Sequence, residues 1–164
     1  MVQPATAMLV LPEAGDSVDF DGFGVNWKID GTLTDRRFAV VHHPIRPHAL
    51  AAPLHRHHNE DEFSFVLRGT MGALLGDEVV RAERGTWVIK PRHQWHTFWN
   101  DGDDPCDIIE IISPAGFAQY FREVAAAWGD LRRFAEINRS YGLEMDFDSV
   151  PRLCERLGLT FPQL

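Results

Sequence analysis

The pattern of hydrophobic and polar residues changes character along this chain. Between residues 23 and 113, short apolar segments alternate with turn signals such as Asp-Gly, Asn-Asp-Gly and single Gly or Pro residues. Many short strands separated by such turns are typical of an antiparallel barrel or sandwich. The predicted strands cover residues 23–29, 38–45, 63–67, 71–75, 79–82, 86–89, 95–99 and 107–112.

After residue 113 the apolar residues take helical spacing. Ser113 resembles a helix N-cap, and Pro114 suits the first helical position. A second helix is expected from Asp130 to Gly142, and a third is expected to stop at Gly158. The stripe that predicts the first helix is Phe117, Phe121, Val124, Ala125 and Trp128.

These elements predict a single domain. The 164 residues are enough for one core, and about three helices alone would bury too little surface to fold separately. We therefore expect an extended N-terminal arm at residues 1–22, a β-barrel at 23–113 and a helical cap at 114–164. The fold class is all-β, with C-terminal helices packed on the barrel.

Composition narrows the possible partners. The net charge of −8 argues against nucleic acid and against an anionic membrane surface. No apolar run reaches the length of a membrane span. Cys106 and Cys154 fit no metal or redox spacing, so we expect reduced thiols and a cytoplasmic protein.

The candidate chemistry begins at residues 55–62, His-Arg-His-His-Asn-Glu-Asp-Glu. His55 and His57 share a face if the backbone is extended, because side chains alternate along a strand. Glu62, beyond a polar turn, can return to that face from the next strand. Imidazoles and a carboxylate on one inward face form half of a divalent-metal site, and His96 is the best candidate for the other half.

Two spacings carry a resemblance to a known family: His55-x-His57-x4-Glu62-x6-Gly69 and Gly85-x5-Pro91-x4-His96-x3-Asn100. Both resemble the short motifs of the cupin family, as does the gap between them, and the likeness is strongest over residues 49–100. Two positions depart from the family pattern, since Ala49 and His93 stand where glycine is usual. His93 must either adopt a positive φ or sit in a different turn that points it toward the pocket mouth.

The resemblance implies a double-stranded β-helix, or jelly-roll barrel, with His55, His57, Glu62 and His96 as metal ligands. Three imidazoles and one carboxylate suit one divalent transition metal per chain, namely iron, manganese, nickel, copper or zinc. The alternative is that these histidines lie on a surface loop and bind no metal. His58 could also substitute as a ligand.

Strand parity extends the prediction to a pocket and an outer face. If Glu62 points inward, so do Ser64 and Val66, and Phe98 points inward with His96. These three residues are the predicted substrate pocket for a small molecule. The side chains that alternate with these inward residues form an apolar outer face. A second sheet, the helices or another subunit must cover this face, so we expect a homodimer. Its members are Phe63, Phe65, Leu67, Trp95 and Trp99.

The other polar residues are interpreted as solvent-exposed residues without a role in the site. His42, His43 and His48 could line the pocket, but histidines at strand ends and beside proline are usually solvated. Glu60 and Asp61 are expected to be turn residues outside the barrel.

Function follows from the resemblance more than from the residues. The similarity to small quercetin-dioxygenase-type cupins implies a metal-dependent dioxygenase acting on a small oxygen-rich, flavonol-like aromatic substrate. Glu62 would be a ligand and, by partial release, a proton acceptor; no second acid or base stands out. Two alternatives stay open: a metal-containing binding or sensing module without turnover, and a Lewis-acid isomerase or lyase.

Overall fold

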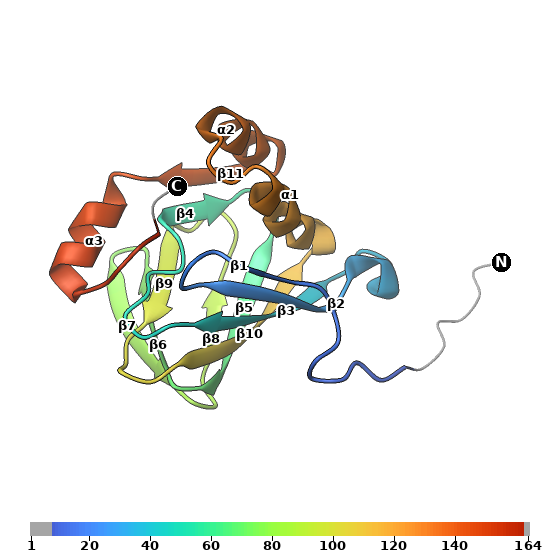
Figure 1. The fold of residues 1–164 in the computed structure, drawn as a ribbon, viewed down its shortest axis with the longest axis horizontal. Helices are drawn as coiled ribbons and strands as arrows, with labels where there is room; N and C mark the ends of the chain where they lie inside the picture. The colour runs from blue at the N-terminus through green and yellow to red at the C-terminus, as the bar shows by residue number, and fades with distance from the viewer. Residues whose placement is uncertain (1–7, 163–164) are drawn as a thin grey trace.

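The structure is a computed structural model that describes residues 8–162. The predicted antiparallel β architecture with C-terminal helices is confirmed, because the strands form two antiparallel sheets that enclose the core (Figure 1). Residues 1–7 of the predicted arm and residues 163–164 of the predicted cap lie outside the described residues.

The first sheet has six strands. In spatial order they are β1 (Ser17–Asp19), β2 (Gly24–Ile29), β3 (Ala39–Ile45), β10 (Cys106–Ser113), β5 (Asp61–Arg68) and β8 (Trp87–Lys90). The short strand β1 lies within the predicted arm and pairs with β2. The strand β8 is the other edge of this sheet.

The second sheet has five strands. In spatial order they are β11 (Leu143–Asp146), β4 (Leu54–His57), β9 (His96–Asn100), β6 (Thr70–Leu75) and β7 (Glu78–Glu83). Pairing of β11 with β4 joins the C-terminal region to the strand that carries His55 and His57. Neither β4 nor β11 is among the predicted strands, because Leu-His-Arg-His and Leu-Glu-Met-Asp contain no β-branched or aromatic hydrophobic residue of the kind that marks a strand.

Alternation along the central strands decides which side chains enter the barrel. In β5, Glu62, Ser64 and Val66 are buried while their neighbours are less so, which confirms the predicted parity. In β10 the same alternation buries Glu110 between two isoleucines. The inner faces of this sheet therefore bring polar groups as well as apolar ones into the interior.

The helical region consists of a 3-10 turn (Ala115–Gln119) and the helices α1 (Tyr120–Ala126), α2 (Leu131–Ser140) and α3 (Ser149–Leu157); a further 3-10 turn spans Gly31–Thr34. Asp130 caps α2 through the backbone N–H of Arg133, and Gly158 ends α3 in the left-handed conformation. The predicted N-cap at Ser113 is wrong, because Ser113 belongs to β10 and its hydroxyl donates to Arg37 O at 2.9 Å.

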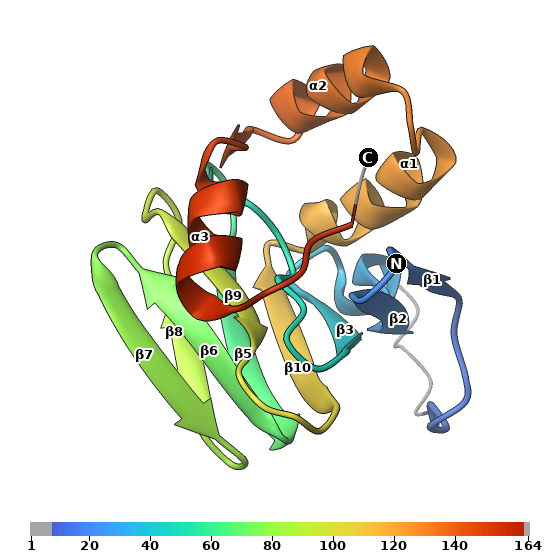
Figure 2. The same cartoon turned by 60° about the vertical axis from the view of Figure 1, so that its left-hand side comes forward.

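The helices cover two different parts of the barrel. In both views α1 and α2 lie together at one end of the sheets, whereas α3 lies against the five-stranded sheet (Figure 2). Trp99, which points outward from β9, packs there with Leu153 of α3 and with Leu159. Trp99 was expected to need a covering element because it points outward, and α3 is that element. Among residues 8–162, no helix is long and apolar enough to cross a membrane.

Candidate metal centre

Three strands bring the four predicted ligands together inside the barrel. His55 and His57 project from the same face of β4, and His55 stands directly opposite His96 of β9. Glu62 reaches the group from β5 of the other sheet. All four side chains are buried, and one potential ligand atom from each lies within 4.8 Å of the others.

Backbone carbonyls orient two of the imidazoles. The Nδ1 of His55 lies 2.8 Å from Pro53 O, and the Nδ1 of His96 lies 3.0 Å from Gln94 O. A carbonyl can only accept, so each Nδ1 carries the proton and each Nε2 keeps a free lone pair. Burial, followed by the neighbouring imidazoles, holds the pKa of His55 well below its usual value, and burial also lowers the pKa of His96. Neutral imidazole is the form that binds metal ions.

Glu62 faces both histidines and a lysine. Its Oε1 lies 3.5 Å from His57 Nε2, and its Oε2 lies 3.4 Å from His96 Nε2 and 3.0 Å from Lys90 Nζ. Burial alone would raise the pKa of Glu62, but the Lys90 ammonium and the two imidazoles lower it well below the usual value. The group therefore presents an ionised carboxylate beside free imidazole nitrogens.

These residues fit a metal ion. Ligands placed about 2.0–2.2 Å from a shared zinc ion lie roughly 3–4 Å from one another, which matches the separations around Glu62. Within residues 8–162, neither His57 Nε2 nor His96 Nε2 has a hydrogen-bond partner, although both are buried. Buried polar atoms without a partner are costly, and a shared cation would satisfy both.

Glu60 and His93 both lie near His57, and only Glu60 differs from its prediction. Glu60 is not a solvated turn residue: it is only 4% exposed, and its Oε2 lies 3.7 Å from His57 Nδ1. It closes the outer side of His57 as the turn folds back against the barrel. His93 adopts φ 69°, the first of the two alternatives, and its N–H donates to His57 O at 2.7 Å. His58 lies at the surface and contacts Glu144 instead of the ligand group.

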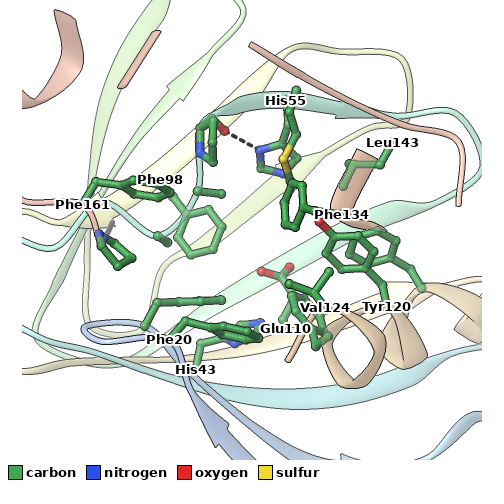
Figure 3. Close-up of a pocket in the computed structure, with 18 of the residues that line it drawn as sticks. Phe20, His43, His55, Phe98, Glu110, Tyr120, Val124, Phe134, Leu143 and Phe161 are labelled. Atoms are coloured by element: carbon green, nitrogen blue, oxygen red, sulfur yellow. Dashed lines mark hydrogen bonds between the residues drawn. The ribbon is translucent and has the colours of Figure 1, made fainter. Parts of the chain in front are cut away.

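A cavity of about 90 Å³, partly open to solvent, adjoins the ligand group between the barrel and the helical cap. Aromatic and aliphatic side chains form most of its wall, and Figure 3 shows His55 and His43 on opposite sides of it. Of the three residues proposed for a pocket, Phe98 lines this cavity, whereas Ser64 and Val66 do not. The hydroxyl of Ser64 is taken up by Glu110, and Val66 is fully buried in the core.

A second ionic pair, missed by the sequence reasoning, stands beside Glu62. Lys90 is fully buried, with its Nζ 2.8 Å from Glu110 Oε2 as well as 3.0 Å from Glu62. Burial opposes its charge, but Glu110 and Glu62 together raise the pKa of Lys90. Burial raises the pKa of Glu110 to about 7, against the pull of Lys90. The available signal was a charged residue in an apolar setting: Lys90 ends Trp-Val-Ile-Lys, and Glu110 stands between two pairs of isoleucines in Ile-Ile-Glu-Ile-Ile.

His43 is also part of the cavity wall and is not solvated. Its Nδ1 donates to Gly24 O at 2.8 Å, and its ring packs against Phe23 with centroids 4.5 Å apart. The alternation of β3 turns it inward together with Val41 and Ile45. The neighbouring prolines suggested a solvated loop, but β3 continues through Pro44.

Comparison with protein families supports the cupin interpretation. Residues 41–112 match the model of the cupin domain. This stretch contains all four candidate ligands, Lys90 and Glu110. A comparison with curated proteins gives no match.

Solved structures show the same fold at low sequence identity. KdgF from Halomonas sp. is 20% identical, with a TM-score of 0.59, covering 66% of this chain and 94% of its own. A predicted oxalate decarboxylase from Thermotoga maritima is 16% identical, with a TM-score of 0.59, covering 65% and 99%. Pac13, a nucleoside dehydratase, is 13% identical, with a TM-score of 0.54, covering 66% and 83%. The barrel is thus a cupin jelly roll, and its buried group of three histidines and one glutamate suggests a metal site.

The substitution His96→Ala tests the ligand group. It removes one imidazole from a buried set of four, so metal affinity should fall by at least about 10–100-fold, the loss that even outer partners of ligands produce. The thermal stabilisation coupled to metal binding should be lost with it. Metal content is measured on protein purified without chelator. His58→Ala, at the surface, should retain the metal, and unchanged content in His96→Ala would refute the assignment.

His43 predicts a dependence of stability on pH. Burial lowers its pKa to about 3, against about 6.5 in an unfolded chain. As the pH falls from about 6.5 to about 3, the unfolded state binds a proton that the folded state does not, so stability is lost. His43→Asn keeps a donor for Gly24 O and removes this titration. Urea unfolding should show a slope against pH that is smaller by up to ~1.4 kcal/mol per pH unit; equal slopes would contradict the prediction.

Proposed function

We propose that this cupin-fold protein is a metal-dependent dioxygenase acting on a small, oxygen-rich aromatic substrate of the flavonol or catechol type. The observation that carries the proposal is the cavity: its aromatic and aliphatic wall also includes His55 and Glu62 of the buried group of three histidines and one carboxylate. Such a chamber suits a ligand with an apolar body and one metal-binding polar end.

The composition of the cavity wall also favours an aromatic substrate. Outside the ligand group its ionisable side chains are His43, Glu110 and Tyr120. Aromatic rings such as those of Phe23, Phe117 and Phe121 lie around them. A nucleoside or oxalate, the compounds named for two structural neighbours, would leave many polar atoms against these rings without partners. A flat aromatic molecule would instead stack on them.

Each part of the site has a role in the proposed reaction. His55, His57, Glu62 and His96 hold the metal, which would supply the activation of dioxygen that side chains cannot provide. Glu62 has two carboxylate oxygens, so that one can bind while the other accepts a proton from a substrate hydroxyl. The aromatic wall contributed by the cap excludes water from the reacting group.

A Lewis-acid isomerase or lyase is the second candidate, and one observation favours it. Lys90 and Glu110 form an ionisable pair beside the ligand group, and such a pair could move protons in a reaction without net oxidation. A binding module without turnover would use the same cavity without either chemistry.

Metal analysis combined with oxygen uptake tests the proposal. Protein purified without chelator should contain about one iron, manganese, nickel or copper ion per chain, and should consume oxygen with flavonols or catechols. His96→Ala should show no uptake above background. Zinc as the resident metal, no oxygen uptake and a rearranged product by NMR would favour the isomerase or lyase. Tight binding of the same compounds with no product would favour the binding module.

We further propose a homodimer formed through the outer face of β5 and β8. Phe65 packs on Trp87 there, with ring centroids 4.9 Å apart, and Leu67, Trp87 and Ile89 are 48%, 53% and 58% exposed. A two-fold axis brings the same patch of each copy together. The outward residues of these paired strands, from Phe63 to Leu67 and at positions 87 and 89, are uncharged, so two copies could meet without repulsion despite the net charge of −8.

Light scattering at micromolar concentration tests the dimer. The mass should be twice the 18.6 kDa of one chain. Trp87→Glu places a charge in the proposed interface and should give the monomer. Leu131→Glu, at a 65% exposed position of α2, should remain dimeric. A monomeric wild-type protein would refute the proposal.

A further inference from the structure

Glu110 has one carboxylate oxygen engaged and one free. Its Oε2 accepts from Lys90 Nζ at 2.8 Å and from the Ser64 hydroxyl at 2.9 Å. Its Oε1 has no hydrogen-bond partner within residues 8–162, although the side chain is only 1% exposed. The residue lines the cavity, where Figure 3 shows it between Val124 and His43.

Lys90 does not need Glu110 as a second carboxylate to neutralise its charge. A single ammonium is already paired with Glu62 at 3.0 Å, and burial of a second carboxylate carries a large desolvation cost. The three-point hold by β5, β8 and β10 fixes Glu110 in position, because Ser64 and Glu110 are opposite each other across β5 and β10 and Lys90 reaches both carboxylates from β8. Such fixed polar groups in an otherwise apolar wall set the orientation of a ligand.

We propose that the free Oε1 of Glu110 is the specificity determinant of the cavity, and that it accepts a hydrogen bond from a ligand hydroxyl adjacent to the oxygens bound at the His55–His57–Glu62–His96 group. The inference rests on the metal site of the proposed function, but it does not require dioxygenase turnover.

The position of Lys90 defines the ligand class. One ammonium separates the carboxylate of Glu110 from that of Glu62, so a group that reaches Glu110 must lie next to the metal-binding atoms of the ligand. An aromatic ring with three contiguous oxygen substituents meets this requirement: two bind at the metal and the third donates to Glu110. A ligand with only two leaves Oε1 buried without a partner.

Pyrogallol and 3-methoxycatechol form a matched pair of probes. Both offer a catechol pair to the metal, but only pyrogallol keeps a donor at the third position. We would titrate each anaerobically into zinc-loaded protein by calorimetry, because zinc binds ligands without redox chemistry. At a pH of about 8.5, where a carboxyl group with a pKa of about 7 is mostly ionised, the wild-type protein should bind pyrogallol roughly tenfold or more tightly than 3-methoxycatechol, the effect of one hydrogen bond to a charged group.

Glu110→Gln reverses the polarity of the free atom. Lys90 and Ser64 are both donors, so they should hold the amide oxygen in the place of Oε2 and leave the amide NH2 facing the cavity. The preference for pyrogallol should then disappear. Glu136→Gln makes the same change on the surface, where Glu136 pairs with Arg133, and should retain it. Zinc content and melting temperature, measured on each variant, show that site and fold are intact.

The outcomes separate this inference from the proposed function. Equal affinity of wild-type protein for the two probes, an unchanged preference in folded, zinc-loaded Glu110→Gln, or no binding of either probe would each overturn it. A preference that is lost only in Glu110→Gln supports it, whether or not the protein loaded with iron, copper, manganese or nickel consumes oxygen.

Discussion

The interior of this barrel depends on one lysine. Lys90 lies between Glu62 and Glu110, and its single ammonium neutralises part of the charge that these carboxylates bring into an apolar core. Breaking such a buried arrangement by removing one partner typically costs about 3–5 kcal/mol, because an uncompensated charge is left behind. The candidate metal group and the polar wall of the cavity are thus held by the same cation.

This compensation explains why the two glutamates differ. Burial raises the pKa of both, yet Glu62 also faces the imidazoles of His57 and His96, and these together with Lys90 lower its pKa well below the usual value. Glu110 has Lys90 but no imidazole beside it, and its pKa is raised to about 7. One carboxylate is therefore suited to hold a cation and the other to meet a ligand.

The cap converts a common fold into a particular cavity. The 3-10 turn and α1 place Phe117, Tyr120 and Phe121 over the open end of the barrel, where Phe117 contacts His57 with ring centroids 4.3 Å apart. The strand β11 pairs with β4, so that Leu143 and Met145 stand beside the two histidines of β4 and line the same space. Likeness to solved structures at 13–20% identity speaks for the barrel fold, whereas these cap residues line the cavity beside it.

The sequence by itself determined the barrel, its parity and the grouping of four residues. A period of two along β5 placed Glu62, Ser64 and Val66 on one face, because side chains alternate along a strand. The resemblance of two spaced motifs to the cupin family implied that His55, His57, Glu62 and His96 share a site. The partners of that site were decided by the tertiary structure. Lys90 and Glu110 lie twenty residues apart on strands that meet only through β5. The burial of His43 follows from the alternation of β3, which continues through Pro44, but the burial of Glu60 and the contact between Lys90 and Glu110 follow from no such alternation. Such contacts depend on which strands become neighbours, and no pattern within a single strand contains that information.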